Sequence, residues 1–276
     1  MLGYRIEANV MRTTRIEKVD DENEVVKTLH FRDHLCANAE PGQFVMVWLP
    51  GVDEIPMSIS SAYQSRMASI TVGRVGEATR MLHKKTKGDF IGIRGPFGNS
   101  FRPIEGRVLV VGGGTGIAPL AFLLERLVAS AQTVKCFLGA KNRQELLFLS
   151  RISSLFAGRA ETEIETSTED GSFGHKGVVT ELVEATLATQ TFDMIYACGR
   201  ESMLLEIFHL AQKYEIPLQV SLERIMRCAI GLCGSCNIGK YRVCADGPIF
   251  THKQLAEVKV EFGFQKRDFD GRRISS

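Results

Sequence analysis

Four cysteines near the carboxyl end of the sequence constrain this chain more than any other feature. Cys228, Cys233, Cys236 and Cys244 follow one another as C-x4-C-x2-C-x7-C, so four thiols fall within 17 residues that also contain three glycines. The spacing of the first three thiols is typical of plant-type [2Fe-2S] ligation. A four-cysteine zinc site is the alternative, although zinc ribbons usually carry two C-x2-C pairs and this stretch has one. The spacing favours an iron–sulfur cluster and leaves zinc open.

The remaining cysteines and the charge balance limit the setting in which the chain works. Cys36, Cys136 and Cys198 occur singly, unlike the paired framework of a secreted protein, so we expect a reducing, cytoplasmic setting. The formal net charge is +2, which gives no reason to expect a nucleic-acid partner. No apolar run approaches the roughly 20 residues of a membrane-spanning helix, and the amino-terminal segment has no signal-peptide core. We therefore expect no membrane association.

The first hundred residues alternate short apolar segments with proline and glycine turns. Segments of this length without intervening long helices are typical of an antiparallel barrel or sandwich. A short helix is expected at 79–85, where Thr79 can cap the first turn. The expected strands are 4–15, 25–31, 44–49, 68–74 and 89–94.

Two motifs in this region indicate more than an ordinary barrel. Ile55 to Ser60 places small hydroxyl groups beside Pro56. Gly73 to Thr79 ends a strand in a glycine turn and opens a helix, an arrangement that offers backbone N–H groups to a phosphate. Each motif alone is also explained as a plain turn. Their order ahead of the Gly-Pro-Phe-Gly segment 95–98 favours a barrel that holds a ligand.

A strand–loop–helix unit opens the middle of the chain. Residues 107–111 are a continuous apolar run, and the glycine loop 112–116 and Pro119 follow it ahead of a predicted helix at 120–130. Proline in the first helical turn after a glycine loop is what an anion-binding unit needs. The loop differs from the G-x-G-x-x-G dinucleotide fingerprint and, lacking a following Lys-Ser/Thr, from a P-loop.

Strands and helices then alternate up to residue 222, which predicts a doubly wound parallel sheet. Ligands of such sheets bind at the carboxyl ends of the strands, where the loops 112–116, 168–174 and 198–203 fall. Cys198 ends one strand and is either a buried apolar residue or a ligand contact. Asn142 and Arg143 follow the second strand, where an adenosine ribose often sits, and do not separate NADH from NADPH. The expected strands are 134–138, 160–165, 193–198 and 218–222, and the expected helices 143–148, 177–187 and 200–214.

The motifs occur in an order that resembles the ferredoxin-reductase flavoproteins. PGQF, PMSIS, GEAT, GPFG, GGGTGIAPL and CGRESML follow one another as in that family, where a flavin barrel precedes a nicotinamide-nucleotide domain. The segments TEDGSFGHKGVVTEL and VSLERIMRCAIGLCGSCNIGKYRVCADGPIF narrow the resemblance to the electron-transfer subunits of B-type, NAD-dependent dihydroorotate dehydrogenase. The resemblance covers nearly the whole chain. It implies FAD, a [2Fe-2S] cluster and NAD, with NADP as the alternative nucleotide.

The resemblance also assigns residues by position. The four cysteines match the cluster ligands. Ile55 stands where many members have an arginine that pairs with the flavin phosphate, and we expect Arg74 to replace it. No catalytic residue is assigned, and Ser58 and Cys198 are expected to orient the flavin and the nicotinamide. The implied FAD contacts are Pro56, Met57, Ser58, Ile59, Gly73, Arg74, Gly76, Ala78 and Thr79, and the implied NAD contacts are Gly112, Gly113, Gly114, Thr115, Gly116, Cys198 and Gly199.

Motif order and resemblance together predict three domains and one function. They are an FAD-binding antiparallel β-barrel at 1–103, an NAD-binding α/β domain at 104–222 and a [2Fe-2S] domain at 223–276. A nicotinamide gives up a hydride and a cluster accepts single electrons, so a flavin is needed to convert between them. We expect electrons to pass between NAD and a separate flavin-containing dihydroorotate dehydrogenase chain, in a heterotetramer of two plus two chains that serves pyrimidine biosynthesis. The chain should not oxidise dihydroorotate alone.

Three other functions fit part of the sequence. The chain could serve a different complex, such as a ferredoxin:NADP oxidoreductase, a sulfide dehydrogenase or a hydrogenase. It could be a free-standing NAD(P)H diaphorase. A zinc-stapled nucleotide-binding module is the non-enzymatic alternative.

Overall fold

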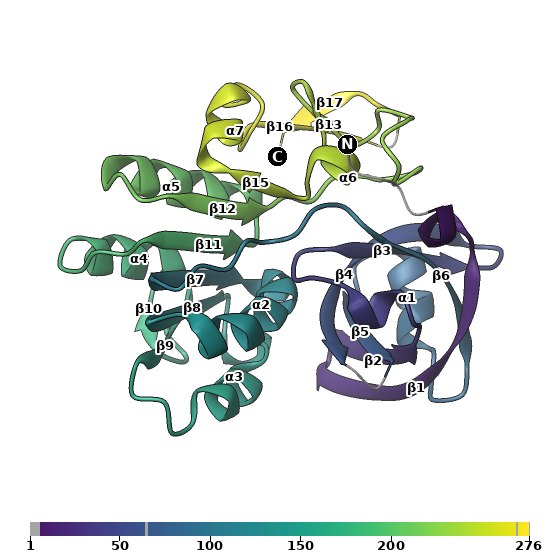
Figure 1. Cartoon of the computed structure of the whole chain (residues 1–276), viewed down its shortest axis with the longest axis horizontal. Coiled ribbons are helices and arrows are strands. Elements are labelled where there is room, and N and C mark those ends of the chain that lie inside the picture. Colours follow the sequence, from purple (N-terminus) through teal and green to yellow (C-terminus); the bar gives the residue numbers. More distant parts are fainter. Residues whose placement is uncertain (1–5, 64–65, 269, 276) are drawn as a thin grey trace.

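The computed structural model describes residues 6–63, 66–268 and 270–275. A closed barrel and an α/β sheet lie side by side, and the C-terminal region lies across both of them at the top of Figure 1. The predicted fold class, a barrel followed by a doubly wound sheet and a small C-terminal region, is confirmed. No helix among the described residues is long and apolar enough to cross a membrane.

Six antiparallel strands close the barrel in the order β1-β2-β5-β4-β3-β6. Closure comes from β1 and β6, where Arg12 lies opposite Ile93. The short helix α1 (Glu77–His83) packs the fully buried Leu82 into the barrel core. The strands are β1 (Arg12–Asn23), β2 (Val26–Arg32), β3 (Phe44–Leu49), β4 (Asp53–Tyr63), β5 (Met67–Gly73) and β6 (Phe90–Phe97).

Strand β4 was missed by the sequence analysis, which interpreted 55–60 as a turn beside Pro56. Residues 53–58 pair with β3, whereas pairing with β5 starts at Ile59. This half of β4 therefore has one open edge, which is where a strand tolerates a proline. The predicted strand 4–15 is also wrong in part, because a 3-10 helix spans Ile6–Asn9 and β1 begins at Arg12. Residues 4 and 5 lie outside the described residues.

The α/β sheet has the order β10-β9-β8-β7-β11-β12-β15. The chain starts at the central strand β7, moves outward to β8, β9 and β10, and then returns to β11 on the other side of β7. The order therefore reverses between β7 and β11, the place where ligands bind in such sheets. The parallel strands are β7 (Arg107–Gly113), β8 (Thr133–Ala140), β9 (Thr162–Thr168), β10 (His175–Lys176), β11 (Met194–Cys198) and β12 (Leu218–Ser221).

Helices cover both faces of this sheet. α2 (Ile117–Ser130) and α3 (Leu149–Phe156) pack on one face, and α4 (Val179–Leu187) and α5 (Glu201–Lys213) pack on the other. The helix predicted at 143–148 is wrong: only Arg143–Glu145 form a 3-10 turn, and α3 starts later. Phe148 adopts a φ of 60°, so a helix cannot run through it.

The C-terminal region is joined to the α/β sheet by hydrogen bonding. Its strand β15 (Ile249–Thr251) pairs antiparallel with β12, so that Ile249 lies opposite Ser221, and becomes the last strand of the sheet. The sheet therefore continues across the predicted domain boundary at 222/223. The other elements of this region are β13 (Asn237–Ile238), β14 (Tyr241–Arg242), α6 (Val243–Asp246), α7 (His252–Glu257), β16 (Gln265–Arg267) and β17 (Arg273–Ser275).

Two side chains of the barrel bind the C-terminal region. Asn99 donates its amide to the carbonyls of Asp246 and Ile249, at 3.1 and 2.9 Å, and accepts from the N–H of Ile249 at 2.9 Å. Arg94 forms two hydrogen bonds to the Glu54 carboxylate, at 2.7 and 2.8 Å, and reaches the carbonyl of Cys228 at 3.5 Å. The barrel, the sheet and the cysteine loop thus hold one another in place.

Phe250 is the side chain that should matter most for this junction. It is fully buried in β15 and shares one core with Leu218 and Val220 of β12. We expect Phe250→Ala to lower the free energy of unfolding by about 3 to 5 kcal/mol, because it leaves a cavity in that core. Urea unfolding measures the loss. Phe264→Ala is the matched control, because this phenylalanine is 56% exposed; equal losses in the two variants would contradict the interpretation.

Candidate functional site

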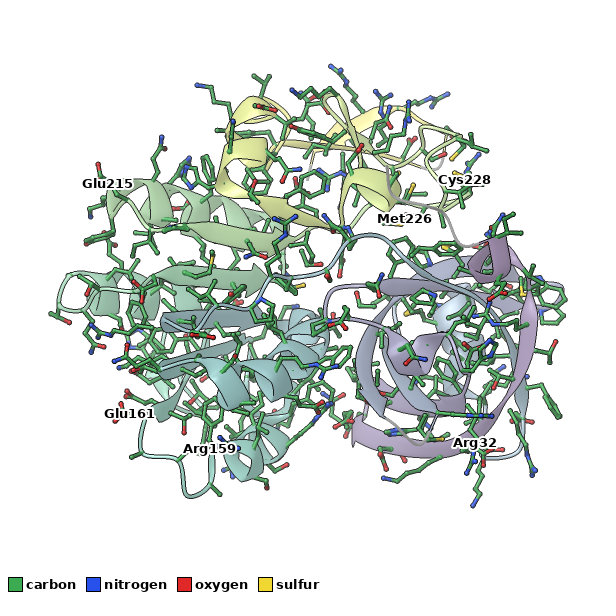
Figure 2. All side chains as sticks on the ribbon, in the orientation of Figure 1. Arg32, Arg159, Glu161, Glu215, Met226 and Cys228 are labelled. Atoms are coloured by element: carbon green, nitrogen blue, oxygen red, sulfur yellow. The ribbon has the colours of Figure 1, made fainter. Side chains whose placement is uncertain are left out.

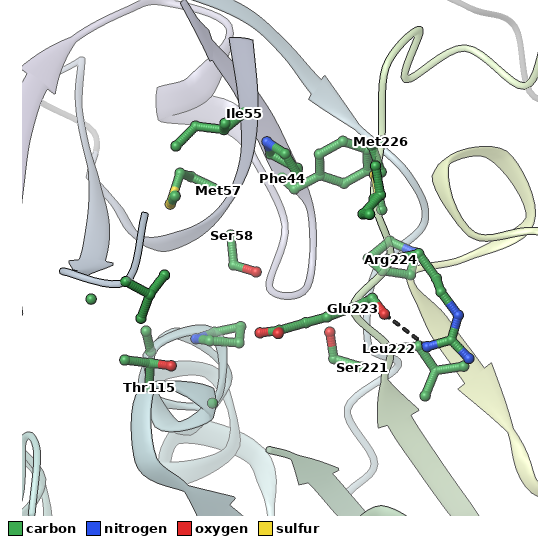
Figure 3. Close-up of a pocket in the computed structure, with 18 of the residues that line it drawn as sticks. Phe44, Ile55, Met57, Ser58, Thr115, Ser221, Leu222, Glu223, Arg224 and Met226 are labelled. Carbon is green, nitrogen blue, oxygen red and sulfur yellow. Dashed lines mark hydrogen bonds between the residues drawn. The ribbon is translucent and has the colours of Figure 1, made fainter. Parts of the chain in front are cut away.

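A cavity of about 850 Å³ lies between the barrel, the start of α2 and the chain that leaves β12. The open edge of β4 supplies residues 53–58, and Thr71, Gly73, Val75 and Thr79 continue the barrel side. Figure 3 shows Met57 and Ser58 directed into this first cavity, opposite Glu223. Its volume lies within the 300–1,000 Å³ typical of ligand sites.

Most of the predicted FAD contacts line this cavity, and some do not. Pro56, Met57, Ser58, Gly73 and Thr79 are on its wall. Ile59 and Ala78 are instead buried in the barrel core, where β4 and α1 pack. Gly76 lies on neither this wall nor that of the second cavity described below.

Arg74 does not lie where the sequence analysis expected it. Its side chain lines the second cavity and not the first. Its role as the replacement for the flavin-phosphate arginine stays a prediction. The cations that do line the first cavity come from the chain after β12 and from the C-terminal hairpin, and they are Arg224, Arg227, Lys266 and Arg267.

Two backbone N–H groups in the turn before α1 form hydrogen bonds to a side chain of α1 itself. The Thr79 hydroxyl accepts from the N–H groups of Val75 and Gly76, at 2.9 and 2.8 Å. Thr79 therefore caps the helix from inside its first turn, in the manner of a capping box. Because these two N–H groups are already bonded, this turn offers fewer donors to a phosphate than the sequence analysis assumed.

A second cavity of about 740 Å³ opens at the carboxyl ends of β7, β8, β9 and β11. The loop after β7 contributes Gly113 to Gly116, and Gly199 faces it from the loop after β11. This is the point where the strand order reverses, as the doubly wound fold requires. Gly112 lies behind this loop against Ile117 and lines neither cavity. Cys198 lines the first cavity and not the second, and burial raises the pKa of its thiol.

Close packing explains two of the glycines at this reversal point. A Cβ atom on Gly116 would lie 2.4 Å from the carbonyl oxygen of Cys198, so the loops after β7 and β11 touch there. A Cβ atom on Gly113 would lie 2.7 Å from the sulfur of Met203. Larger residues would push the two loops apart and open the floor of the second cavity. Glycine at these two positions therefore allows the loop after β7 to pack closely against the loop after β11 and the start of α5.

The two cavities share five wall residues. The shared residues are Gly73, Val75, Thr115, Gly116 and Glu223. The two cavities are therefore neighbours, and these five residues stand at the border between them. Glu223 and its neighbours 221–227 were missed by the sequence analysis, which ended the last strand at 222 and read no role into the chain before the cysteines. The phrase SLER gives no recognisable motif by itself.

Arg224 fixes this connecting segment. Its guanidinium makes two hydrogen bonds to the Glu201 carboxylate of α5, at 2.6 and 2.8 Å, and a third to the carbonyl of Glu223 at 2.8 Å. Glu201 also accepts from the N–H of Gly263 at 2.9 Å. The pair links α5, the segment 221–227 and the C-terminal region. Figure 3 shows the bond from Arg224 to the carbonyl of Glu223.

Three of the predicted cluster ligands, Cys228, Cys233 and Cys236, lie in the loop that follows this segment, and Cys244 lies in α6. Cys228 lies next to the barrel (Figure 2), where Arg94 reaches its carbonyl. Cys236 and Cys244 are buried, Cys228 is partly buried and Cys233 is exposed. Backbone N–H groups point at the sulfurs: Gly231 to Cys244 at 3.3 Å, and Leu232 and Cys233 to Cys228 at 3.4 Å each. Among the described residues, no three side chains of ligating type converge as they would around a single metal ion.

The thiols influence one another electrostatically. The hydrogen bond with Cys244 lowers the pKa of Cys236 to about 7, and the same contact raises the pKa of Cys244. Although partial burial opposes ionisation, hydrogen bonds with Ser235 and Cys228 lower the pKa of Cys233 to about 6. Two of the sulfurs thus favour the thiolate form, which is the form that ligates iron. Thiolates surrounded by N–H donors fit a [2Fe-2S] cluster, whose potential such donors tune.

Family models match two parts of the chain. The model described as the iron-sulfur cluster binding domain of dihydroorotate dehydrogenase B matches residues 223–256, which contain all four cysteines. The oxidoreductase NAD-binding domain matches residues 110–207.

Curated relatives match nearly the whole chain. A probable dihydroorotate dehydrogenase B (NAD(+)) electron transfer subunit from Methanocaldococcus jannaschii is 42% identical over 94% of this chain and 96% of its own. The same-named protein of Methanothermobacter thermautotrophicus is 40% identical over 96% and 98%.

Solved structures agree on the fold. An NADH-dependent reduced ferredoxin-NADP oxidoreductase matches with a TM-score of 0.80 at 28% identity, over 91% of this chain and 92% of its own. The flavohem-like FAD/NAD-binding domain of nitric oxide dioxygenase from Vibrio cholerae matches with a TM-score of 0.65 at 19% identity, over 74% and 94%. The second likeness covers the barrel and sheet architecture alone.

Breaking the Arg224–Glu201 pair should cost stability. The two side chains are only 2% and 13% exposed, so Arg224→Met leaves a carboxylate without its main partner in a dry place. We expect the free energy of unfolding to fall by about 3 to 5 kcal/mol. Lys213→Met is the control, because its ion pair with Glu184 is more than half exposed on both sides and should be worth below about 1 kcal/mol. Denaturant unfolding compares the two, and a similar small loss in both would refute the assignment.

Proposed function

Because the chain belongs to the family of dihydroorotate dehydrogenase B electron-transfer subunits, we propose that it carries electrons from a catalytic partner chain to NAD+. The observation that carries this proposal is the continuity of three sites. The second cavity meets the first at five shared residues, and the segment that walls the first cavity runs directly into Cys228. The predicted FAD, [2Fe-2S] and NAD set fits the family and the NAD-binding and iron–sulfur domain matches.

Each site holds its group by different means. We assign NAD to the second cavity, where the loop 113–116 and Gly199 supply close backbone. We assign FAD to the first cavity, where Pro56, Met57 and Ser58 form the wall and the Ser58 hydroxyl faces inward (Figure 3). The flavin supplies the conversion between a hydride and single electrons. The protein orients the two groups and keeps them adjacent.

The cysteine loop is the side that faces a partner. Leu232 is 78% exposed and Cys233 beside it is exposed as well. Arg94 connects this loop to the barrel surface, where Asn9 also binds its guanidinium. Exposed apolar side chains continue along that surface at Ile6, Val10, Met11 and Trp48. We define Leu232 and these four residues as the docking surface for the catalytic chain, because exposed apolar groups around a redox centre mark an interface.

The assembly is the one that the resemblance to the family implies. Two electron-transfer chains would combine with two catalytic chains, each of which carries its own flavin and oxidises dihydroorotate, a step in pyrimidine biosynthesis. We propose the cytoplasm as the location, because ligating thiols must stay reduced to receive iron. The 28% identical oxidoreductase structure supports the alternative that a related complex uses this chain, but the 42% identical relative favours the dihydroorotate partner.

Reconstitution tests the function directly. The purified chain should reduce dyes with NADH but leave dihydroorotate untouched. Adding a dihydroorotate dehydrogenase catalytic chain should produce dihydroorotate-dependent reduction of NAD+. The absence of any coupling, with both chains carrying their flavins, would favour the ferredoxin, sulfide or hydrogenase alternatives. A colourless protein that contains zinc would overturn the assignment of both cofactors.

Cys233→Ser should separate the two halves of the electron path. Cys233 is the exposed thiol of the four, so its loss alters the centre at the surface and leaves the two cavities unchanged. We expect flavin content and NADH-driven dye reduction within about twofold of the parent, and NAD+ reduction through the partner to fall by at least about a hundredfold. Visible and electron paramagnetic resonance spectra check the cluster. A parallel fall of both activities with full flavin content would contradict this division.

Leu232→Asp tests the docking surface. Leu232 is 78% exposed, so a charge there should have little effect on the stability of the folded chain. The same charge should strongly weaken binding at an apolar interface. We expect the dissociation constant for the catalytic chain to rise by at least about tenfold, with an unchanged cluster spectrum, as measured by calorimetry. Val260→Asp is the matched control, because Val260 is 79% exposed, as Leu232 nearly is, and is not one of the five residues of the docking surface. Equal weakening by both variants would exclude this surface.

A further inference from the structure

Glu223 occupies a position that the proposed electron path leaves without a role. It is the one charged member of the five residues that line both cavities. Its side chain is open to the cavity, and Figure 3 shows it extending from the segment after β12 toward Thr115, beneath Ser58. Hydride transfer requires the flavin and the nicotinamide to touch, so in this assignment the two rings must meet beside the residues that border both cavities. The Glu223 carboxylate therefore stands where the nicotinamide ring must arrive.

The backbone of Glu223 is fixed while its carboxylate is left unpaired. The carbonyl accepts from Arg224, which the Glu201 carboxylate holds in turn. Among the described residues, no side chain or backbone group donates a hydrogen bond to the Glu223 carboxylate. The surrounding protein raises the pKa of this carboxyl, opposed by the charge of Lys266 across the first cavity. An unpaired carboxylate that opens into a cavity whose walls disfavour its charge gains from a cationic ligand.

The two redox states of the nucleotide differ in the charge of the nicotinamide ring. The nicotinamide ring of NAD+ carries a positive charge, and the dihydronicotinamide ring of NADH is neutral. We propose that Glu223 is the residue that discriminates between them, attracting the pyridinium ring and so strengthening the binding of NAD+ relative to NADH. This inference rests on the proposed function, since it places NAD and FAD in the two cavities. The Glu223 charge would make the site bind NAD+, the electron acceptor, more tightly than its reduced product NADH.

Equilibrium binding to the oxidised, FAD-containing chain tests the inference without turnover. Three ligands separate the contributions: NAD+, tetrahydro-NAD with a neutral ring that cannot donate a hydride, and ADP-ribose without a nicotinamide. Calorimetry gives each dissociation constant. We expect Glu223→Gln to weaken NAD+ by about three- to tenfold, as loss of one partly screened charge pair predicts, and to change the other two by less than about twofold.

Glu206→Gln is the matched control. Glu206 is an exposed acid of α5 that lines the second cavity alone, so its loss removes the same charge away from the shared region. We expect it to change NAD+ and ADP-ribose by the same factor. If Glu223→Gln loses its flavin, Glu223→Ala removes the charge without introducing an amide and is compared in the same way.

The outcomes separate this inference from the function it rests on. A parent chain that binds neither NAD+ nor ADP-ribose would overturn the proposed function itself. If the parent binds both ligands and Glu223→Gln shifts NAD+ and tetrahydro-NAD equally, or shifts neither, charge discrimination by Glu223 is wrong. Selective weakening of NAD+ supports it.

Discussion

The pairing of β15 with β12 is the constraint on which the rest of the molecule depends. Three residue pairs, Gln219 with Thr251, Val220 with Phe250 and Ser221 with Ile249, attach the cysteine region to the α/β sheet. The side-chain amide of Asn99 makes two hydrogen bonds to the backbone of β15. It donates to the carbonyl of Ile249 and accepts from the N–H of Ile249. All three parts of the chain therefore meet at one short strand. Backbone hydrogen bonds of this kind are directional, so they fix orientation as well as contact.

This junction determines how far apart the redox groups can be. Cys228 follows Ser221 by seven residues, so the first cluster ligand lies at most about 25 Å from the end of β12 however the segment is bent. The same segment walls the first cavity through residues 221–227. One stretch of chain therefore serves as sheet end, cavity wall and approach to the cysteines. Arg224 prevents it from moving independently of α5.

The sequence predicted the separate structural elements better than the contacts that join them. Periodicity and glycine loops identify the barrel, the doubly wound sheet and the cysteine loop, because each of these depends on local chemistry. Glu223 and the pairing of β15 depend on contacts between distant segments, and no local pattern encodes them. Pro56 hid β4, because a proline in a strand is readable only when the open edge beside it is known. Arg74 was expected beside the other flavin contacts, but it lines the second cavity, because side-chain direction after a glycine turn cannot be read from spacing.

The loops of the site show the same difference between features that local sequence predicts and features that long-range packing determines. Thr79 was expected to cap the start of a helix at 79–85, but α1 starts at Glu77 after Gly76, and Thr79 is its third residue. From there its hydroxyl occupies two amides that a phosphate was expected to use. Cys198 lies at the strand end as expected, but it lines the first cavity and not the second, which holds the other expected NAD contacts from Gly113 to Gly116. Local rules thus identified the residues, whereas their partners followed from packing.

The edge position of β15 has a consequence for how the chain matures. During synthesis β12 emerges well before β15, and until residues 249–251 arrive its outer edge presents unpaired N–H and C=O groups. Such an edge is a template for pairing with another chain, so unfinished or truncated molecules would be prone to association. The cysteine region therefore protects the sheet from self-association as well as carrying the metal centre. A chain that ends before residue 249 is therefore expected to aggregate, and its state of association should be measured before its activity.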